Sequence, residues 1–253
     1  MLTKDVEAMA QAAVNKAGLC NEHFGKYFMR AIMAGFFIVV ATILSNVSAA
    51  VLYPTYPQFA KLLGAFLFSI AIVLIVFIGG ELFTGNNMTM AMGAYNGSCS
   101  VKDVVKVWIV SYIGNFIGAF ILGAIFVGSG ASHAIMVNYY NSFIDAKLSI
   151  APLEMVLRGI MCNFMVCIAV LTGTRMKSES GKLIVMFCVI MAFVVAGFEH
   201  CIANMGTFSI AYMLLGGINL GLVAKSMLFV TIGNIIGGAV LLALPLKVMS
   251  AEN

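Results

Sequence analysis

The chain has 253 residues, of which 62% are hydrophobic and only 9% are charged, and its net charge is +4. Soluble domains carry about 25% charged residues, so this composition excludes an ordinary soluble protein. The small positive charge gives no reason to expect a nucleic-acid partner. We predict an all-α polytopic membrane protein in contact with membrane lipid.

The N-terminal segment, residues 1–27, carries several charged side chains ahead of the first long apolar run. This is the wrong order for a cleaved signal peptide. Apolar side chains between residues 3 and 19 recur at helical spacing, opposite Lys4 and Lys16. We therefore expect an amphipathic N-terminal helix along the cytoplasmic membrane face, packed against the bundle. A gating role is the alternative.

Apolar stretches long enough to cross a membrane follow this segment. They cover residues of about 28–50, 62–95, 102–129, 152–172, 183–214 and 226–246. Six spans place both termini on one side, and most Lys and Arg residues fall on that side, so cytoplasmic termini in the inner (plasma) membrane are expected. Residues 28–247 then form one six-span domain, and residues 248–253 form a cytoplasmic tail.

Polar residues interrupt the second and fifth spans at equivalent places. Glu81 and Asn86 have the same separation as Glu199 and Asn204, and apolar sequence continues on both sides. Unwound backbone inside a bilayer is tolerated only where protein buries it or where it lines a watery cavity. Paired broken helices point to a substrate site near the membrane midplane. Both spans are therefore predicted to be broken helices around a transport site.

Further matches relate the two halves of the chain. Gly114-Asn-Phe-Ile-Gly118 is similar to Gly233-Asn-Ile-Ile-Gly237, and Arg30-Ala-Ile-Met33 is similar to Arg158-Gly-Ile-Met161. The chain therefore reads as a duplicated three-helix unit, with repeat 1 at about 28–129 and repeat 2 at about 152–247. Because the unit has an odd number of spans, the second copy enters the membrane from the opposite face. This predicts two inverted repeats whose breaks face each other.

His200 and Thr84 are the polar side chains best placed to meet a solute at these breaks. His200 is the only histidine predicted inside the membrane, and a buried ionisable residue there is a functional candidate. The alternative is a neutral imidazole bonded to a freed carbonyl. The Thr84 hydroxyl can donate to an anion or to His200, and the alternative is a cap on the helix that restarts near Asn86.

The other polar residues at the breaks have a structural interpretation. A carboxylate beside an unwound helix satisfies loose backbone N–H groups, so Glu81 and Glu199 are assigned to structure, as are Asn86 and Asn204. Lys147 lies in the outer connection before the fourth span. It is either a solvated surface lysine or the positive mouth of an anion path.

The six cysteines show no metal-type spacing, and the most direct interpretation is packing. A membrane enzyme or haem protein would need clustered ligands or paired carboxylates, and one intramembrane histidine does not supply them. We predict no metal site, no cofactor and no enzyme activity.

Five short motifs together resemble the formate/nitrite transporter family, and most closely its hydrosulfide-channel branch. They are Gly80-Glu-Leu-Phe-Thr-Gly85, Gly114-Asn-x-x-Gly118, Asn163-Phe-Met-Val-Cys167, Gly197-Phe-Glu-His-Cys-Ile-Ala-Asn-Met205 and Gly233-Asn-Ile-Ile-Gly-Gly238. The resemblance covers nearly all of residues 28–246. It implies an aquaporin-like six-helix protomer, assembly into a homopentamer and a separate pore through each protomer.

The same resemblance implies roles for individual residues. It implies that Leu82 forms the cytoplasmic constriction and that Phe68 and Phe193 form apolar walls near the constrictions. It also implies that Thr84 and His200 lie between the constrictions.

By this resemblance, Lys147 would attract anions to the pore. Our hypothesis is a passive channel for small monovalent anions of weak acids, chiefly hydrosulfide, with formate and nitrite as similar substrates. A bare anion cannot cheaply cross apolar constrictions, and protonation in transit removes this obstacle. A dedicated formate or nitrite channel, or a proton-coupled transporter, is the alternative. An aquaporin-like pore for neutral solutes is a different class, and the breaks lack its Asn-Pro-Ala signature.

Overall fold

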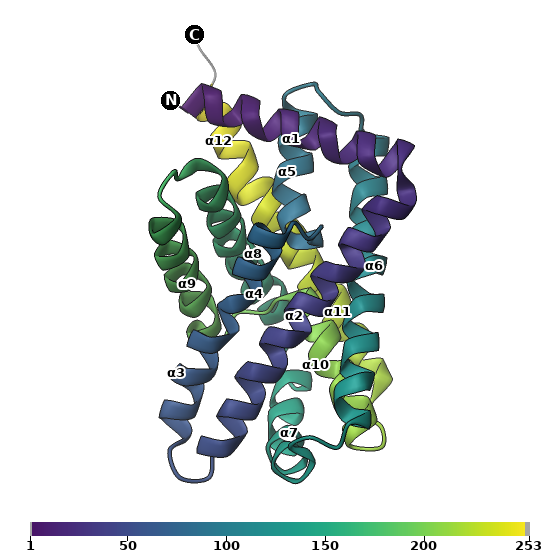
Figure 1. Ribbon diagram of the computed structural model, residues 1–253, viewed down its shortest axis with the longest axis vertical. Coiled ribbons are helices and arrows are strands. Elements are labelled where there is room, and N and C mark those ends of the chain that lie inside the picture. The colour runs from purple at the N-terminus through teal and green to yellow at the C-terminus, as the bar shows by residue number, and fades with distance from the viewer. Residues whose placement is uncertain (1, 251–253) are drawn as a thin grey trace.

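A computed structural model describes residues 2–250, which form twelve α-helices and one π-helix (Figure 1). Their bounds are α1 Leu2–Glu22, α2 Phe24–Leu52, α3 Pro57–Phe68, α4 Ile70–Ile78, α5 Phe83–Tyr95, α6 Val101–Gly128, α7 His133–Leu148, α8 Pro152–Arg175, α9 Glu179–Ala196, α10 Cys201–Leu214, α11 Leu220–Ile235, the π-helix η1 Ile236–Ala243 and α12 Leu244–Ser250.

Six segments of the described chain are long and apolar enough to cross a membrane. They are Phe24–Leu52, Pro57–Ile78, Val101–Gly128, Pro152–Arg175, Glu179–Ala196 and Leu220–Ser250. The prediction of an all-α protein with six membrane spans is therefore confirmed. The last span runs further than predicted, and residues 251–253 of the predicted tail lie outside the described residues.

Spans two and five are both broken, as predicted. Helix α4 ends at Gly79 and helix α9 at Gly197, and both glycines have the left-handed backbone that ends a helix (φ 96° and 78°). The chain restarts as α5 and α10 after short extended segments. In Figure 1, α5 lies toward one end of the bundle and α10 toward the other. The two half-helices start near the middle of the molecule and diverge, as inverted repeats require.

Equivalent backbone hydrogen bonds support the two repeats. The N–H of Glu81 donates to the carbonyl of Arg30 (3.1 Å), and the N–H of Glu199 donates to the carbonyl of Arg158 (3.3 Å). Each break is thus joined to the first helix of its own repeat. The same connection is made twice because the sequences of the two halves match at these positions.

Glycines allow the helices of each repeat to pack closely. A Cβ atom at Gly118 would lie 2.1 Å from the carbonyl oxygen of Ile32, and one at Gly237 would lie 2.2 Å from that of Ile160. Both distances are far below van der Waals contact, so only glycine fits at either position. The two glycine motifs therefore join α2 to α6 and α8 to the sixth span.

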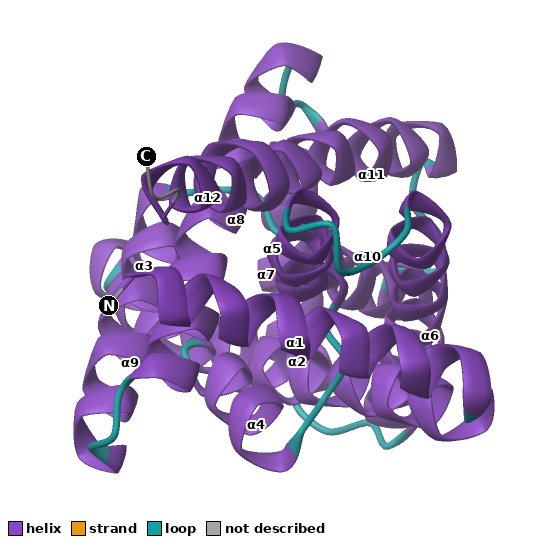
Figure 2. Cartoon of the chain, turned by 90° about the horizontal axis from the view of Figure 1, so that it is seen from above, coloured by secondary structure: helices purple, strands orange, loops and turns teal. Residues whose placement is uncertain are grey.

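Helix α1 lies across one end of the bundle (Figures 1 and 2). Val6, Met9 and Ala13 on its apolar stripe are buried, and the carboxylate of Asp5 lies 2.6 Å from the guanidinium of Arg175. The amphipathic stripe in the sequence therefore packs against the ends of the spans. We refer to this end of the molecule as the α1 end.

The connection between the third and fourth spans contains a helix that the sequence analysis did not predict. Residues 133–148 form α7, which buries Met136, Tyr140, Ile144 and Leu148 against the bundle. These side chains recur every fourth residue and form one helical face. The segment is too polar to stand out as a membrane span, so its periodicity was missed. It lies at the end of the bundle opposite α1 (Figure 1), which we call the α7 end.

Candidate anion-conduction site

Two asparagines hold the broken helices at the centre of the protomer. The side-chain oxygen of Asn115 accepts from the N–H of Phe83 (2.9 Å), and that of Asn234 accepts from the N–H of Cys201 (2.8 Å). The Asn115 amide nitrogen also donates to the carbonyl of Glu81 at 3.0 Å. Each asparagine therefore satisfies a donor at the first residue of one half-helix, where the helix has no internal partner.

The glutamates at the breaks do not contact backbone N–H groups, so the expected reason for their presence is wrong. The carboxylate of Glu81 lies 2.6 Å from the ammonium of Lys16, and that of Glu199 lies 2.7 Å from the ammonium of Lys147. A carboxylate in an apolar interior needs a counter-charge more than it needs one neutral donor. Each glutamate therefore binds a lysine that comes from outside its own broken span.

Lys16 was missed as a site residue because it belongs to the surface helix α1. It corresponds in role to Lys147 of α7, because each lysine comes from the helix that precedes one repeat. Neither lysine is freely solvated: the exposed fraction of the side chain is 23% for Lys16 and 17% for Lys147. In the sequence, the signal for this arrangement was that each break carries a glutamate and so needs a buried counter-charge.

The two asparagines that follow the glutamates make different contacts. The amide of Asn204 donates to Glu199 (2.8 Å), and its oxygen accepts from Lys147 (3.0 Å), which completes a three-residue cluster. The amide of Asn86 instead donates to the hydroxyl of Tyr27 at 2.9 Å. The charged cluster at the α7 end is therefore more extensively hydrogen-bonded than its counterpart at the α1 end.

Thr84 and His200 meet at the centre of the protomer. The Thr84 Oγ1 atom lies 3.0 Å from His200 Nε2, and both side chains are buried. The other ring nitrogen, Nδ1, accepts from the N–H of Ala203 (3.1 Å), so His200 is the N-cap of α10. A neutral imidazole that accepts at Nδ1 carries its hydrogen on Nε2. His200 therefore donates to Thr84, and the hydrogen of the Thr84 hydroxyl is left to donate elsewhere.

This arrangement favours the neutral form of His200. Protonation at Nδ1 would turn the acceptor of the Ala203 N–H into a second donor. The hydrogen bond that caps α10 would be lost, and two N–H groups would face each other in a buried place. The histidine is thus both a helix cap and a donor, and the threonine is not the cap that the alternative interpretation expected.

A cavity of about 420 Å³ at the α7 end reaches this central pair. Phe68, Phe193 and His200 are among the residues that line it. The rings of Phe68 and Phe193 are nearly perpendicular with centroids 6.2 Å apart, and the ring of Phe193 stacks on His200 with the same separation. Lys147 and Glu199 also line the cavity. The charged cluster, the two phenylalanines and the histidine therefore share one cavity.

Leu82 and Thr84 are buried and do not line this cavity. Leu82 lies in the extended segment that leads into α5. Leu82 therefore belongs to the first repeat and the Phe193 side chain to the second. The structure brings the polar residues Thr84 and His200 into direct contact and keeps Leu82 outside the cavity that contains Phe68 and Phe193.

Asn163 is a further residue that the sequence analysis did not select. Its side-chain nitrogen donates to the carbonyls of Thr84 (3.1 Å) and Asn234 (2.6 Å), so it connects the two repeats beside the central pair. An asparagine within an apolar span was the available signal, because a buried amide must find partners.

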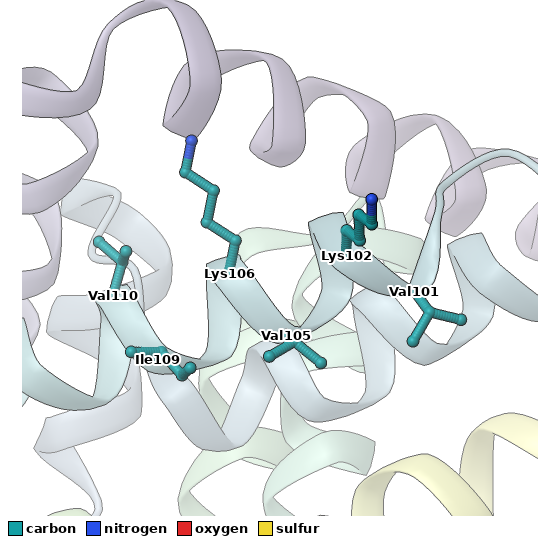
Figure 3. A pocket seen from close by; sticks show the side chains of 6 residues that line it. All are labelled: Val101, Lys102, Val105, Lys106, Ile109 and Val110. Carbon is teal, nitrogen blue, oxygen red and sulfur yellow. The ribbon is translucent and has the colours of Figure 1, made fainter.

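A second cavity of about 490 Å³ lies along α6 and is separate from these residues (Figure 3). Val101, Val105 and Ile109 line it and are exposed. Lys102 and Lys106 extend away from these aliphatic side chains in Figure 3. This cavity is an open apolar surface of a membrane span. Within residues 2–250, no cluster of three or more His, Cys, Asp or Glu side chains could hold a metal ion.

The comparisons with known proteins agree with this geometry. A family model described as "Formate/nitrite transporter" matches residues 3–248. A protein of Plasmodium falciparum (isolate 3D7) named "Formate-nitrite transporter" is 32% identical over 242 residues, which cover 88% of this chain and 77% of that protein.

Two solved structures have the same fold. A structure titled "FNT family ion channel" has a TM-score of 0.91 at 24% identity and covers 98% of this chain and 100% of that chain. One titled "Pentameric formate channel with formate bound" has a TM-score of 0.78 at 28% identity and covers 90% and 98%. The protein is thus a multi-pass membrane transport protein and not an enzyme. The chain belongs to the formate/nitrite transporter family.

Proposed function

We propose that the protein is a passive channel for small monovalent anions of weak acids, with hydrosulfide as the preferred substrate. The observation that carries this proposal is the contact between Thr84 and His200, which leaves a hydroxyl donor in an otherwise apolar centre. The channel functions as a homopentamer in the plasma membrane, with one pore in each protomer and both termini in the cytoplasm. The pentameric title of a similar solved structure and the Lys/Arg distribution support these points.

The apolar residues set the main barrier. Phe68 and Phe193 form the constriction at the α7 end, and Leu82 forms the one at the α1 end. An anion loses its hydration shell between these side chains, and one neutral hydrogen bond does not restore what is lost. A weak-acid anion avoids this cost by taking up a proton and crossing as the neutral acid. Thr84 then donates to the solute at the point where no water is present.

The lysine–glutamate clusters act at the mouths of the pore. Lys147 lies beside Glu199 and lines the cavity, so an entering anion meets an ammonium group whose charge is already balanced. The pair therefore offers donors to the anion without holding it as tightly as an isolated lysine would. Weak binding of this kind suits conduction, because the ion must also leave.

Hydrosulfide suits such a pore because it is weakly hydrated for an anion and is easily protonated near neutral pH. Formate and nitrite are similar weak-acid anions, and the names of the relatives favour them. A dedicated formate or nitrite channel, with or without proton coupling, is therefore the second candidate.

The test is flux into proteoliposomes that contain the full-length protein. Uptake of hydrosulfide, formate and nitrite is measured from pH 5 to pH 8, with protein-free liposomes as the control because hydrogen sulfide crosses lipid by itself. Protein-dependent hydrosulfide flux above that of formate and nitrite is expected. A preference for formate or nitrite supports the second candidate. Swelling with neutral polyols, without anion flux, would overturn both.

A further inference from the structure

Two basic side chains near the α1 end of α2 have no acidic partner. Within residues 2–250, neither the ammonium of Lys26 nor the guanidinium of Arg30 lies within 4.0 Å of a carboxylate oxygen. The N–H of Glu81 contacts the backbone of Arg30, yet its carboxylate is occupied by Lys16 at 2.6 Å. Lys26 and Arg30 are both exposed and lie one helical turn apart. Two adjacent positive charges therefore stand uncompensated at one end of a membrane span.

An apolar groove of about 370 Å³ begins beside these two charges, between α2 and the end of α4. Its walls include Lys26, Met29, Arg30, Met33, Phe37 and Ile78. Met29 is 57% exposed and Ile78 is 63% exposed, so the groove is open at the side of the protomer. Along α2, the charged side chains come first and the apolar ones follow toward the membrane interior.

The second repeat carries the same stripe with one difference. Lys26, Met29, Arg30 and Met33 align at one constant offset with Glu154, Leu157, Arg158 and Met161. In the second repeat, the guanidinium of Arg158 lies 2.8 Å from the carboxylate of Glu154, so its charge is balanced within the helix. The apolar positions and the arginine are kept, and only the first charge is reversed. The repeat at the α1 end therefore lacks a counter-ion that its equivalent contains.

We propose that Lys26, Arg30 and the groove beside them bind an anionic phospholipid at the α1 side of the membrane. The phosphate of the headgroup supplies the missing negative charge, and an acyl chain lies against Met29, Met33 and Phe37. Basic side chains next to a membrane span attract anionic lipids in this way, and their aliphatic stems lie along apolar surface. A zwitterionic lipid fits less well, because its own cation would lie near both basic groups.

Native mass spectrometry of the intact, full-length protein tests this proposal. The protein is released from micelles that contain phosphatidylglycerol or phosphatidylcholine, and the lipids that remain bound are counted. The wild type should retain phosphatidylglycerol in preference to phosphatidylcholine. Lys26→Ala should weaken phosphatidylglycerol binding about fivefold, which corresponds to about 1 kcal/mol for one basic side chain. Lys26→Glu, which recreates the charge pattern of Glu154 and Arg158, should weaken it further.

The second repeat supplies the matched control. Glu154→Lys creates the Lys–Arg pattern at the other end and should increase phosphatidylglycerol binding, while phosphatidylcholine binding stays unchanged. Equal retention of both lipids by the wild type, or unchanged phosphatidylglycerol binding in Lys26→Ala, would overturn the proposal. Loss of the oligomer in Lys26→Glu would also overturn it, because the groove would then be a contact between subunits.

Discussion

The ammonium of Lys147 lies 2.7 and 2.8 Å from the two carboxylate oxygens of Glu199, so a helix outside the spans supplies the counter-charge for a broken span. Lys16 and Glu81 make the equivalent contact at the other end at 2.6 Å. Each ion pair therefore connects a surface helix to the break that carries the candidate conduction residues. A change in either pair affects both the fold of the break and the charge at the mouth of the pore.

Lys147→Gln should lower thermal stability and anion flux together. Removing one partner of a buried ion pair leaves an uncompensated charge and typically costs about 3 kcal/mol or more. The double variant Lys147→Met with Glu199→Gln removes both charges and should recover most of the stability. If the lysine also attracts anions, flux in the double variant remains below wild type, and the deficit shrinks as salt rises. Wild-type flux in the double variant would restrict the pair to a structural role.

Widening the apolar constrictions should increase flux and reduce discrimination between anions. Leu82→Ala and Phe193→Ala each remove a large side chain from the proposed path, so less dehydration is needed to pass. Formate and nitrite uptake by proteoliposomes should rise while the assembly stays intact by size-exclusion chromatography. Leu171→Ala, which alters a partly buried leucine outside the cavity lining, is the control. A stable variant with wild-type rates for every anion would contradict this placement.

His200→Asn should keep the pH profile of transport. An asparagine can accept from the N–H of Ala203 and donate to Thr84, as the neutral imidazole does, although it carries no titratable proton. The pH dependence then comes from protonation of the substrate. His200→Leu removes both hydrogen bonds and should lower flux and stability. A pH profile that shifts in His200→Asn would show that the ring itself exchanges the proton.

Thr84→Val should reduce flux while the protein stays folded. The substitution keeps the shape of the side chain and removes the hydroxyl, so the solute loses one neutral donor worth about 1 kcal/mol. Flux should fall roughly fivefold at saturating and at low anion concentration. Thr84→Ser, which keeps the hydroxyl, should behave as wild type. Equal rates in the valine and serine variants would exclude a contact between this hydroxyl and the anion.

The thiol of Cys20 should report whether α1 stays in place. Cys20 is fully buried under α1, and burial raises the pKa of its thiol. Little thiolate is present near pH 7, so a water-soluble maleimide should react slowly and faster as the pH increases. Lys16→Ala removes the ion pair between α1 and Glu81 and should speed the reaction. An unchanged rate would mean that the remaining contacts are enough to hold the helix.

The sequence by itself determined the spans, the two breaks and the repeat. Hydropathy identifies a membrane span because lipid excludes charge, and this signal depends only on neighbouring residues. The glycines that end α4 and α9 are also local signals, since a left-handed backbone favours glycine. His200 and Thr84 could be selected because a polar group in an apolar run is unusual. Their pairing could be expected from the inverted repeat.

Only the tertiary structure decided the partners of those residues. The pairing of Glu81 with Lys16 joins positions far apart in the chain, and no local pattern connects them. The state of His200 depends on two contacts, one from the following turn and one from the other repeat. Hydropathy likewise could not identify α7, whose stripe has meaning only against the bundle that buries it. Charge balance and hydrogen bonding in a buried site are set by whichever groups the fold brings within reach, and the order of residues alone does not contain those distances.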